Sequence, residues 1–129
     1  MEREQHLTPT EWNLMEYLWA NNPCTGRECV DHFSKTVGWS RSTTLTMLRR
    51  MTEKGVLECR ESEGILTYTP LLQRHTAAAQ ETDNFLNRVY RGSVSLLISA
   101  LTQKQALSRD EIDELYAILQ EAQEVDEHD

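Results

Sequence analysis

The sequence predicts a mainly helical protein in two parts, with three helices and a β-hairpin followed by further helices. The chain has 129 residues, 39% of them hydrophobic and 26% charged, which is enough apolar material for a compact core. Capping patterns precede several stretches in which apolar residues recur at helical spacing. Apolar and polar residues alternate between residues 57 and 69, as they do in β-strands.

The first helix is expected to begin at Thr8-Pro-Thr-Glu11, which has the pattern of a capping box with proline at the first helical position. Leu7 before the cap and Trp12 after it have the spacing of a hydrophobic staple. Asn21-Asn-Pro23 is expected to end the helix. Between these limits the apolar residues at helical spacing are Trp12, Met15, Leu18 and Trp19.

Two further helices follow. Thr25-Gly-Arg-Glu28 is a second capping box and opens a short helix whose apolar residues end at Phe33. A third helix is expected to begin near Ser40 and to end at Lys54-Gly55, because a cation in the last turn and a glycine beyond it favour termination. Its buried side is predicted to contain Leu45, Leu48 and Met51.

The hydrophobic period changes from helix to strand after Gly55. Leu57 and Cys59 alternate with charged residues, and Leu66 and Tyr68 alternate with threonines. The intervening segment 62–64 has the sequence Ser-Glu-Gly, which is typical of a turn. These features predict a β-hairpin that ends at Pro70.

The remaining chain is predicted to be helical from about Thr76, with an interruption at Gly92-Ser93 and a third capping box at Ser108–Glu111. We expect two domains, residues 1–75 and residues 76–129 with an acidic tail. Because two or three helices cannot bury all of these apolar stripes alone, we expect the second domain to pair with a second copy. The expected dimerisation residues are Phe85, Leu86, Val89, Tyr90, Leu97, Leu101, Ile112, Leu115 and Leu119.

The net charge of −8 argues at first against a nucleic-acid partner. However, the charge is unevenly distributed along the chain. Residues 76–129 hold four basic and eleven acidic residues, whereas residues 1–75 hold nine and ten. Residues 40–60 hold five basic and two acidic residues, so the segment that contains the third helix is locally positive. The overall acidity therefore does not exclude DNA binding.

Three helices followed by a hairpin is the order of a winged helix-turn-helix, in which the third helix lies in the DNA major groove beside the hairpin. Arginine can pair with guanine or phosphate, and threonine offers a hydroxyl and a methyl group. The predicted DNA-binding residues are Trp39, Arg41, Ser42, Thr43, Thr46, Arg50 and Arg60, of which Trp39 and Arg60 are expected on the backbone side. A charged helix face is often simply solvated, and winged helices also bind proteins, so a protein-interaction adaptor is the alternative.

Several segments together resemble the BlaI/MecI penicillinase-repressor family. They include the first helix from Leu7 to Trp19, Trp39-Ser40 with the third helix that follows, and Tyr68-Thr-Pro70 at the end of the hairpin. The segments Phe85–Gly92 and Leu107–Tyr116 share the resemblance, which therefore covers nearly the whole chain. Each motif alone is weak, but their order and spacing are specific.

The resemblance implies a homodimeric transcriptional repressor on a palindromic operator, with a membrane-bound sensor protease of the BlaR/MecR type as a further partner. Many relatives are inactivated when such a protease triggers cleavage in the dimerisation domain. By position, the cleaved bond is expected between Ala100 and Leu101, where the usual pair of residues is Asn-Phe. Two further departures are Ser42 at a usually basic position, and a wing with three glutamates and a single arginine.

Other functions have weaker support. Three cysteines without a secretory leader indicate reduced thiols in a cytoplasmic protein, and no apolar run is long enough for membrane insertion. Cys29 and His32 lie one helical turn apart, so a metal- or thiol-responsive repressor is a second alternative, although Cys24, Cys29 and Cys59 fit no strong metal-binding pattern. We predict no bound metal or cofactor. No phosphate loop, nucleophile elbow or catalytic cluster occurs, which argues against an enzyme.

Overall fold

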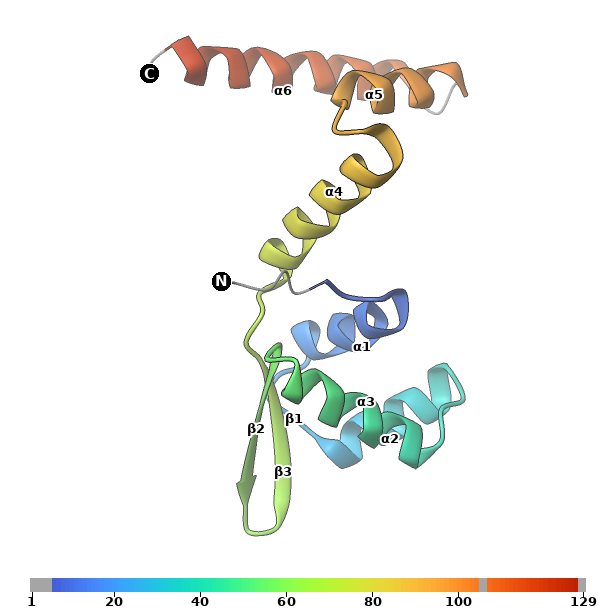
Figure 1. The fold of residues 1–129 in the computed structure, drawn as a ribbon, viewed down its shortest axis with the longest axis vertical. Coiled ribbons are helices and arrows are strands. Elements are labelled where there is room, and N and C mark those ends of the chain that lie inside the picture. Colours follow the sequence, from blue (N-terminus) through green and yellow to red (C-terminus); the bar gives the residue numbers. More distant parts are fainter. Residues whose placement is uncertain (1–5, 105–106, 128–129) are drawn as a thin grey trace. The chain divides into compact units, whose positions relative to one another are not determined.

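The computed structural model describes residues 6–104 and 107–127, and it has the mainly helical winged helix-turn-helix architecture that the sequence predicts (Figure 1). The chain divides into two units, residues 1–84 and 85–129. The boundary falls inside a helix. In chain order the elements are α1 (Pro9–Ala20), β1 (Cys24–Thr25), α2 (Gly26–Thr36), α3 (Arg41–Glu53), β2 (Leu57–Ser62), β3 (Ile65–Pro70), α4 (Arg74–Tyr90), α5 (Val94–Gln103) and α6 (Arg109–Glu127).

Helix α1 begins at the predicted capping box. The Thr8 hydroxyl accepts a hydrogen bond from the Glu11 N–H at 3.1 Å, and the Glu11 carboxylate accepts one from the Thr8 N–H at 2.9 Å. Trp12 and Trp19 are only half-buried and form an edge-to-face pair with centroids 5.3 Å apart. Trp19 stays near the surface of the core because its indole N–H donates to the Leu72 carbonyl at 2.8 Å. The apolar residues of α1 that are fully buried are Leu14, Met15 and Leu18.

The buried face of helix α3 is rotated slightly from the predicted one. Leu48 and Met51 are buried as expected, whereas Leu45 packs against the core but is only half-buried. The core instead receives the stripe formed by Thr44, Met47, Leu48 and Met51. The sequence suggested otherwise because a leucine is the more common core residue and a threonine the less common one. The rotation leaves Leu45 available to line a groove on the surface.

The hairpin has the predicted position and is slightly longer than predicted. Strands β2 and β3 pair antiparallel from Leu57 opposite Pro70 to Ser62 opposite Ile65. The two residues between them, Glu63 and Gly64, have φ values of 52° and 79°, which fit a two-residue turn with positive φ at both positions. The two-residue strand β1 pairs with the other edge of β3 and was not predicted, because so short a strand has no alternation to detect. The sheet order is β1-β3-β2.

The core of the first unit lies between helices α1–α3 and the sheet. It includes Phe33 of α2, Val56 and Leu57 at the start of the wing, and Tyr68 in the central strand, all fully or nearly fully buried. Ala77 of α4 is also buried in this core. The beginning of α4 therefore belongs to the winged-helix unit.

The second unit contains the end of α4 together with α5 and α6. At the end of α4, the Gly92 N–H donates to the Leu86 carbonyl at 3.0 Å, and Gly92 has a φ of 81°, as in a helix C-terminal motif. The predicted cap of α6 is present, since the Glu111 N–H donates to the Ser108 hydroxyl at 3.1 Å. No described residue of this unit is fully buried in the single chain. None of the described helices combines the length and the hydropathy that a membrane crossing requires.

Candidate nucleic-acid interface

The face of α3 opposite its buried stripe carries hydroxyl and guanidinium groups. Ser42, Thr46 and Arg49 follow one another at spacings of four and three residues, so they lie along the middle of this face. Arg41 flanks them on one side and Arg50 on the other. All except the half-buried Thr46 are exposed. The predicted set omitted Arg49, although its spacing from Ser42 identifies it once the buried stripe is known.

The guanidinium groups of α3 are available to a ligand, whereas that of the wing is engaged. In the described part of the chain, Arg41, Arg49 and Arg50 form no ion pair. Arg60 Nε of the wing donates to the Glu58 carboxylate within the same strand. A phosphate would have to compete with that carboxylate for Arg60. The positive charge that can bind an anion therefore lies mainly on α3.

A cluster of hydroxyl groups surrounds the N-terminus of α3. The Ser40 hydroxyl accepts a hydrogen bond from the Thr43 N–H at 3.2 Å and donates to the Thr43 hydroxyl at 3.0 Å. The Ser42 hydroxyl lies 3.2 Å from that of Ser40. Ser40, which the predicted set did not include, thus orients the two predicted residues Ser42 and Thr43. Such a helix N-terminus is a favourable place for an anion such as phosphate.

Trp39 packs against the helix-turn-helix rather than pointing freely outward. Its ring stacks on Phe33 with centroids 4.8 Å apart and planes inclined by 25°, and the side chain is half-buried. The Trp39 N–H donates to the Phe33 carbonyl at 3.1 Å. These contacts fix the turn between α2 and α3, so they determine where α3 begins.

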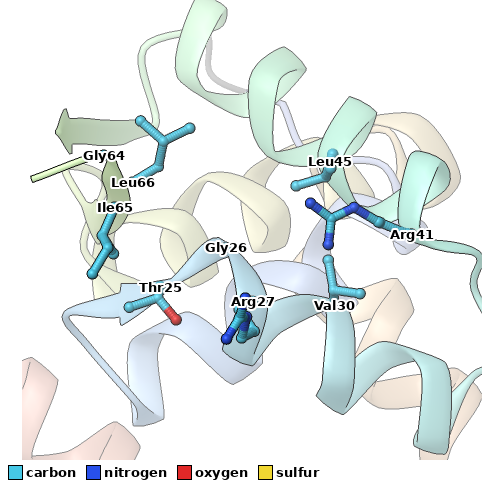
Figure 2. A pocket seen from close by; sticks show the side chains of 9 residues that line it. All are labelled: Thr25, Gly26, Arg27, Val30, Arg41, Leu45, Gly64, Ile65 and Leu66. Atoms are coloured by element: carbon cyan, nitrogen blue, oxygen red, sulfur yellow. The ribbon is translucent and has the colours of Figure 1, made fainter.

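A groove of about 520 Å³ lies beside the exposed face of α3, between this helix, the start of α2 and the tip of the wing (Figure 2). Figure 2 shows Arg27 on the α2 side and Arg41 on the α3 side, with Ile65 and Leu66 on the wing. Sequence reasoning missed Arg27, because nothing local to the second capping box shows that it lies beside α3. The lining residues are Thr25, Gly26, Arg27, Val30, Arg41, Leu45, Gly64, Ile65 and Leu66.

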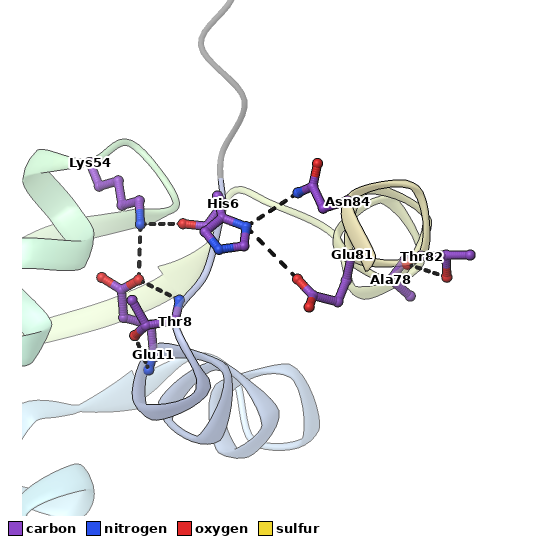
Figure 3. A network of polar contacts seen from close by, with 8 residues as sticks. All are labelled: His6, Thr8, Glu11, Lys54, Ala78, Glu81, Thr82 and Asn84. Atoms are coloured by element: carbon purple, nitrogen blue, oxygen red, sulfur yellow. Dashed lines mark hydrogen bonds and ion pairs between the residues drawn. The ribbon is translucent and has the colours of Figure 1, made fainter. Parts of the chain in front are cut away.

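A polar network ties the C-terminal end of α3 to α1 and α4 (Figure 3). Lys54 at the end of α3 donates to the Glu11 carboxylate at 2.9 Å and to the His6 carbonyl. The His6 ring in turn lies 3.2 Å from the Asn84 amide nitrogen and 3.9 Å from the Glu81 carboxylate. The interface helix is therefore anchored at its far end by the Glu11 side chain and the His6 carbonyl, and the His6 ring in turn contacts α4.

Glu11 is ionised within this network. Burial alone would raise the pKa of its carboxyl group, but the hydrogen bond from the Thr8 N–H and the nearby Lys54 ammonium outweigh burial, and the pKa lies below its usual 4.5. Because Glu11 also caps α1, one carboxylate both satisfies a backbone donor and holds the end of α3.

Two of the three cysteines lie in the core, and Cys59 of β2 is half-buried against it. Cys24 and Cys29 are buried with their sulfur atoms 3.6 Å apart, and burial raises the pKa of the Cys29 thiol. His32, which the sequence placed one turn after Cys29, stacks on Tyr17 with ring centroids 3.9 Å apart. Among the residues that the structure describes, no three His, Cys, Asp or Glu side chains form a group able to hold a metal ion.

The comparisons with known proteins agree with one another. Residues 7–121 match the family model described as "Penicillinase repressor". The chain is 31% identical over 121 residues to the penicillinase repressor of Bacillus licheniformis, covering 94% of each chain. It is 27% identical over 113 residues to the methicillin resistance regulatory protein MecI of Staphylococcus aureus (strain N315), covering 88% of this chain and 92% of that one.

Two solved structures resemble the winged-helix part. One is the solution structure of the DNA-binding domain of the repressor BlaI, with a TM-score of 0.53 and 28% sequence identity. The other is the monomeric form of Bacillus licheniformis BlaI in complex with the blaP half-operator, with a TM-score of 0.51 and 28% identity. Each covers 59% of this chain and 93% of the solved chain.

Proposed function

Because this chain belongs to the penicillinase repressor family, whose members are transcriptional repressors and not enzymes, we propose that it binds operator DNA as a homodimer, with α3 in the major groove. The observation that carries the proposal is the outward face of α3, where arginines without ion pairs among the described residues lie beside short hydroxyl side chains. The similarity to a BlaI structure in complex with a half-operator supports the binding of operator DNA.

The residues of α3 divide by position into two proposed roles. Ser42, Thr46 and Arg49 lie along the middle of the exposed face, where base edges are within reach of a helix in the major groove. Arg41 and Arg50 lie on its flanks, nearer to the phosphates on either side of the groove. Base contacts provide sequence specificity, and phosphate contacts provide affinity and orientation.

The second unit is proposed to form the homodimer. Ten of the fourteen large apolar side chains that are exposed in the described part of the chain lie in residues 85–129, including Ile118 and Leu119, which are 59% and 62% exposed. Exposed apolar area on this scale is typical of a surface that a partner covers. A two-fold dimer would present two α3 helices to half-sites about one helical turn apart, which explains the expected palindrome.

Selection from random duplexes tests this function. We expect the full chain, acting in the cytoplasm as a dimer, to select an inverted repeat and to lose affinity steeply as the salt concentration rises. Half-sites should be spaced by about 10 base pairs or a multiple of that distance. Selection of no common sequence, or binding that salt does not weaken, would contradict operator recognition.

We also propose that the repressor is inactivated by cleavage between Ala100 and Leu101 when a membrane sensor protease of the BlaR/MecR type is active. Both residues lie in α5, where Leu101 is exposed and Ala100 half-buried. Cleavage there would cut the proposed dimerisation unit and release the two DNA-binding units. Co-expression with such a protease in the presence of penicillin, followed by mass spectrometry, should give fragments that end at Ala100. An intact chain or fragments cut elsewhere would disprove this site.

A further inference from the structure

We propose that the groove between α2, α3 and the wing binds the sugar–phosphate backbone of the DNA, with Arg27 and Arg41 binding phosphate oxygens. The proposal rests on the proposed function and extends the backbone contact from Arg41, on the flank of the exposed face of α3, to α2, without using the basic residue of the wing. It adds Arg27, a residue of α2, to the DNA-binding surface.

The charge of the groove fits a phosphate. Arg27 and Arg41 are both exposed, and neither forms an ion pair in the described part of the chain. None of the described residues that line the groove is acidic. Two guanidinium groups that face one space without a carboxylate repel each other unless an anion lies between them.

The wing supplies apolar surface instead of charge. Ile65 and Leu66, at the tip of the hairpin, are 55% and 41% exposed and line the groove together with Leu45. The wing's single arginine is held by Glu58, and Glu61 and Glu63 are exposed beside it. Such a wing is a poor phosphate ligand, but its apolar side chains can pack against deoxyribose while the arginines hold the adjacent phosphate.

The position of the groove also favours DNA over a separate ligand. Arg41 is the first residue of α3 and precedes Ser42, which lies in the middle of the proposed DNA-binding face. The groove is therefore continuous with that face, and a strand that passes beside α3 would run into it. Its anionic phosphates and apolar sugars match the two kinds of side chain that line the groove.

The salt dependence of binding to a mixed-sequence duplex tests this assignment. For Arg27→Ala in the full chain, we expect the slope of log K against log salt to become shallower by about 0.9 per chain. Between 50 and 200 mM salt, the wild-type chain would then lose about 3.5-fold more affinity per chain than the variant. Lys35→Ala is the matched control, because Lys35 lies on the same helix but outside the groove and pairs with Asp31.

Two more variants separate charge from shape. Arg27→Lys should retain most of the wild-type slope, and Leu66→Glu should weaken binding because it places a carboxylate in the groove. A slope for Arg27→Ala equal to that of the wild type, while the wild type still binds DNA, would overturn this assignment and leave the groove to another partner, such as an acidic peptide. If the wild-type chain binds no duplex even at low salt, the proposed function fails as well.

Discussion

Among individual residues, the arginines differ most in what they are free to do. Arg49 and Arg50 are adjacent on α3 but point about 100° apart around the helix axis, so they face different parts of a DNA groove. Arg60 is exposed, but it is already bound to Glu58. All three residues are exposed and positively charged, so these two properties do not show which of them can bind DNA. The direction in which Arg49 and Arg50 leave the helix and the ion pair of Arg60 do distinguish them.

Arg49→Ala is expected to reduce the affinity for the selected operator by about 1–3 kcal/mol and to change binding to mixed-sequence DNA much less, as the loss of a base contact does. Arg50→Ala is expected to weaken both by the same factor, as the loss of a phosphate contact does. Titrations of both duplexes with each variant make this comparison. Arg60→Ala serves as the control with little effect. An operator affinity unchanged by Arg49→Ala would remove this residue from base recognition.

Glu11 makes the stability of the first unit depend on pH. Because its pKa is lowered in the folded chain, its contribution to stability is fully present above the ordinary value of 4.5 and is lost as the pH falls below that value through the folded pKa. We expect Glu11→Gln to reduce the free energy of unfolding at pH 7 and to reduce the difference in stability between pH 7 and pH 3.

Urea denaturation at the two pH values measures this effect. Glu28→Gln is the matched control, because Glu28 occupies the same position of a capping box and its pKa is lowered by its hydrogen bonds to Thr25 without a lysine partner. Its substitution should change the pH dependence less. Equal effects of the two substitutions would show that Lys54 contributes nothing to the pH dependence.

Among the helices and strands, the sequence predicted where the helices begin better than which of their faces are buried. The capping boxes at Thr8, Thr25 and Ser108 are local patterns of four residues, so they could be predicted without knowing what surrounds them. The rotation of α3 and the pairing of β1 depend on packing between segments distant in sequence. For the same reason the groove, and with it Arg27, could not be predicted. The exposed hydroxyl groups and arginines of α3, by contrast, could be predicted from the sequence.

Ser40→Ala is expected to lower the free energy of unfolding by about 1 kcal/mol, because the Thr43 N–H at the start of α3 loses its acceptor. It should also weaken operator binding, since the same hydroxyl orients Ser42 and Thr43. Thermal or urea unfolding and a DNA titration measure the two effects. Ser34→Ala, an exposed position within α2, is the control. Operator affinity equal to the wild type would limit Ser40 to a structural role.

At the scale of the whole molecule, the two units differ in how well a single chain buries their apolar side chains. The first unit has a buried core with residues from every one of its helices, whereas the described part of the second unit has no fully buried residue. The first unit should therefore fold alone. The second requires a partner to cover its apolar side chains.

A chain that ends at Asn84 should be a folded monomer, since it retains Ala77 in the core and lacks the proposed dimerisation helices. Ile112→Asp in the full chain should also shift the dimer toward monomer, because it places a charge among apolar side chains. Sedimentation at equal concentrations compares both with the wild type, for which we expect about twice the monomer mass. Glu121→Gln is a surface control on α6. A truncated chain that still sediments as a dimer would move the dimer interface into the first unit.

Because the second unit is acidic, a rise in ionic strength should favour self-association and weaken DNA binding. Residues 76–129 hold four basic and eleven acidic residues, so two copies brought together repel each other, and added salt weakens this repulsion. The same salt weakens the attraction between α3 and the duplex. Occupancy of the operator should therefore still fall as salt rises, but at low ionic strength the fall should be shallower in dilute solution than at protein concentrations that keep the dimer intact. The difference between the two protein concentrations measures the electrostatic repulsion between subunits.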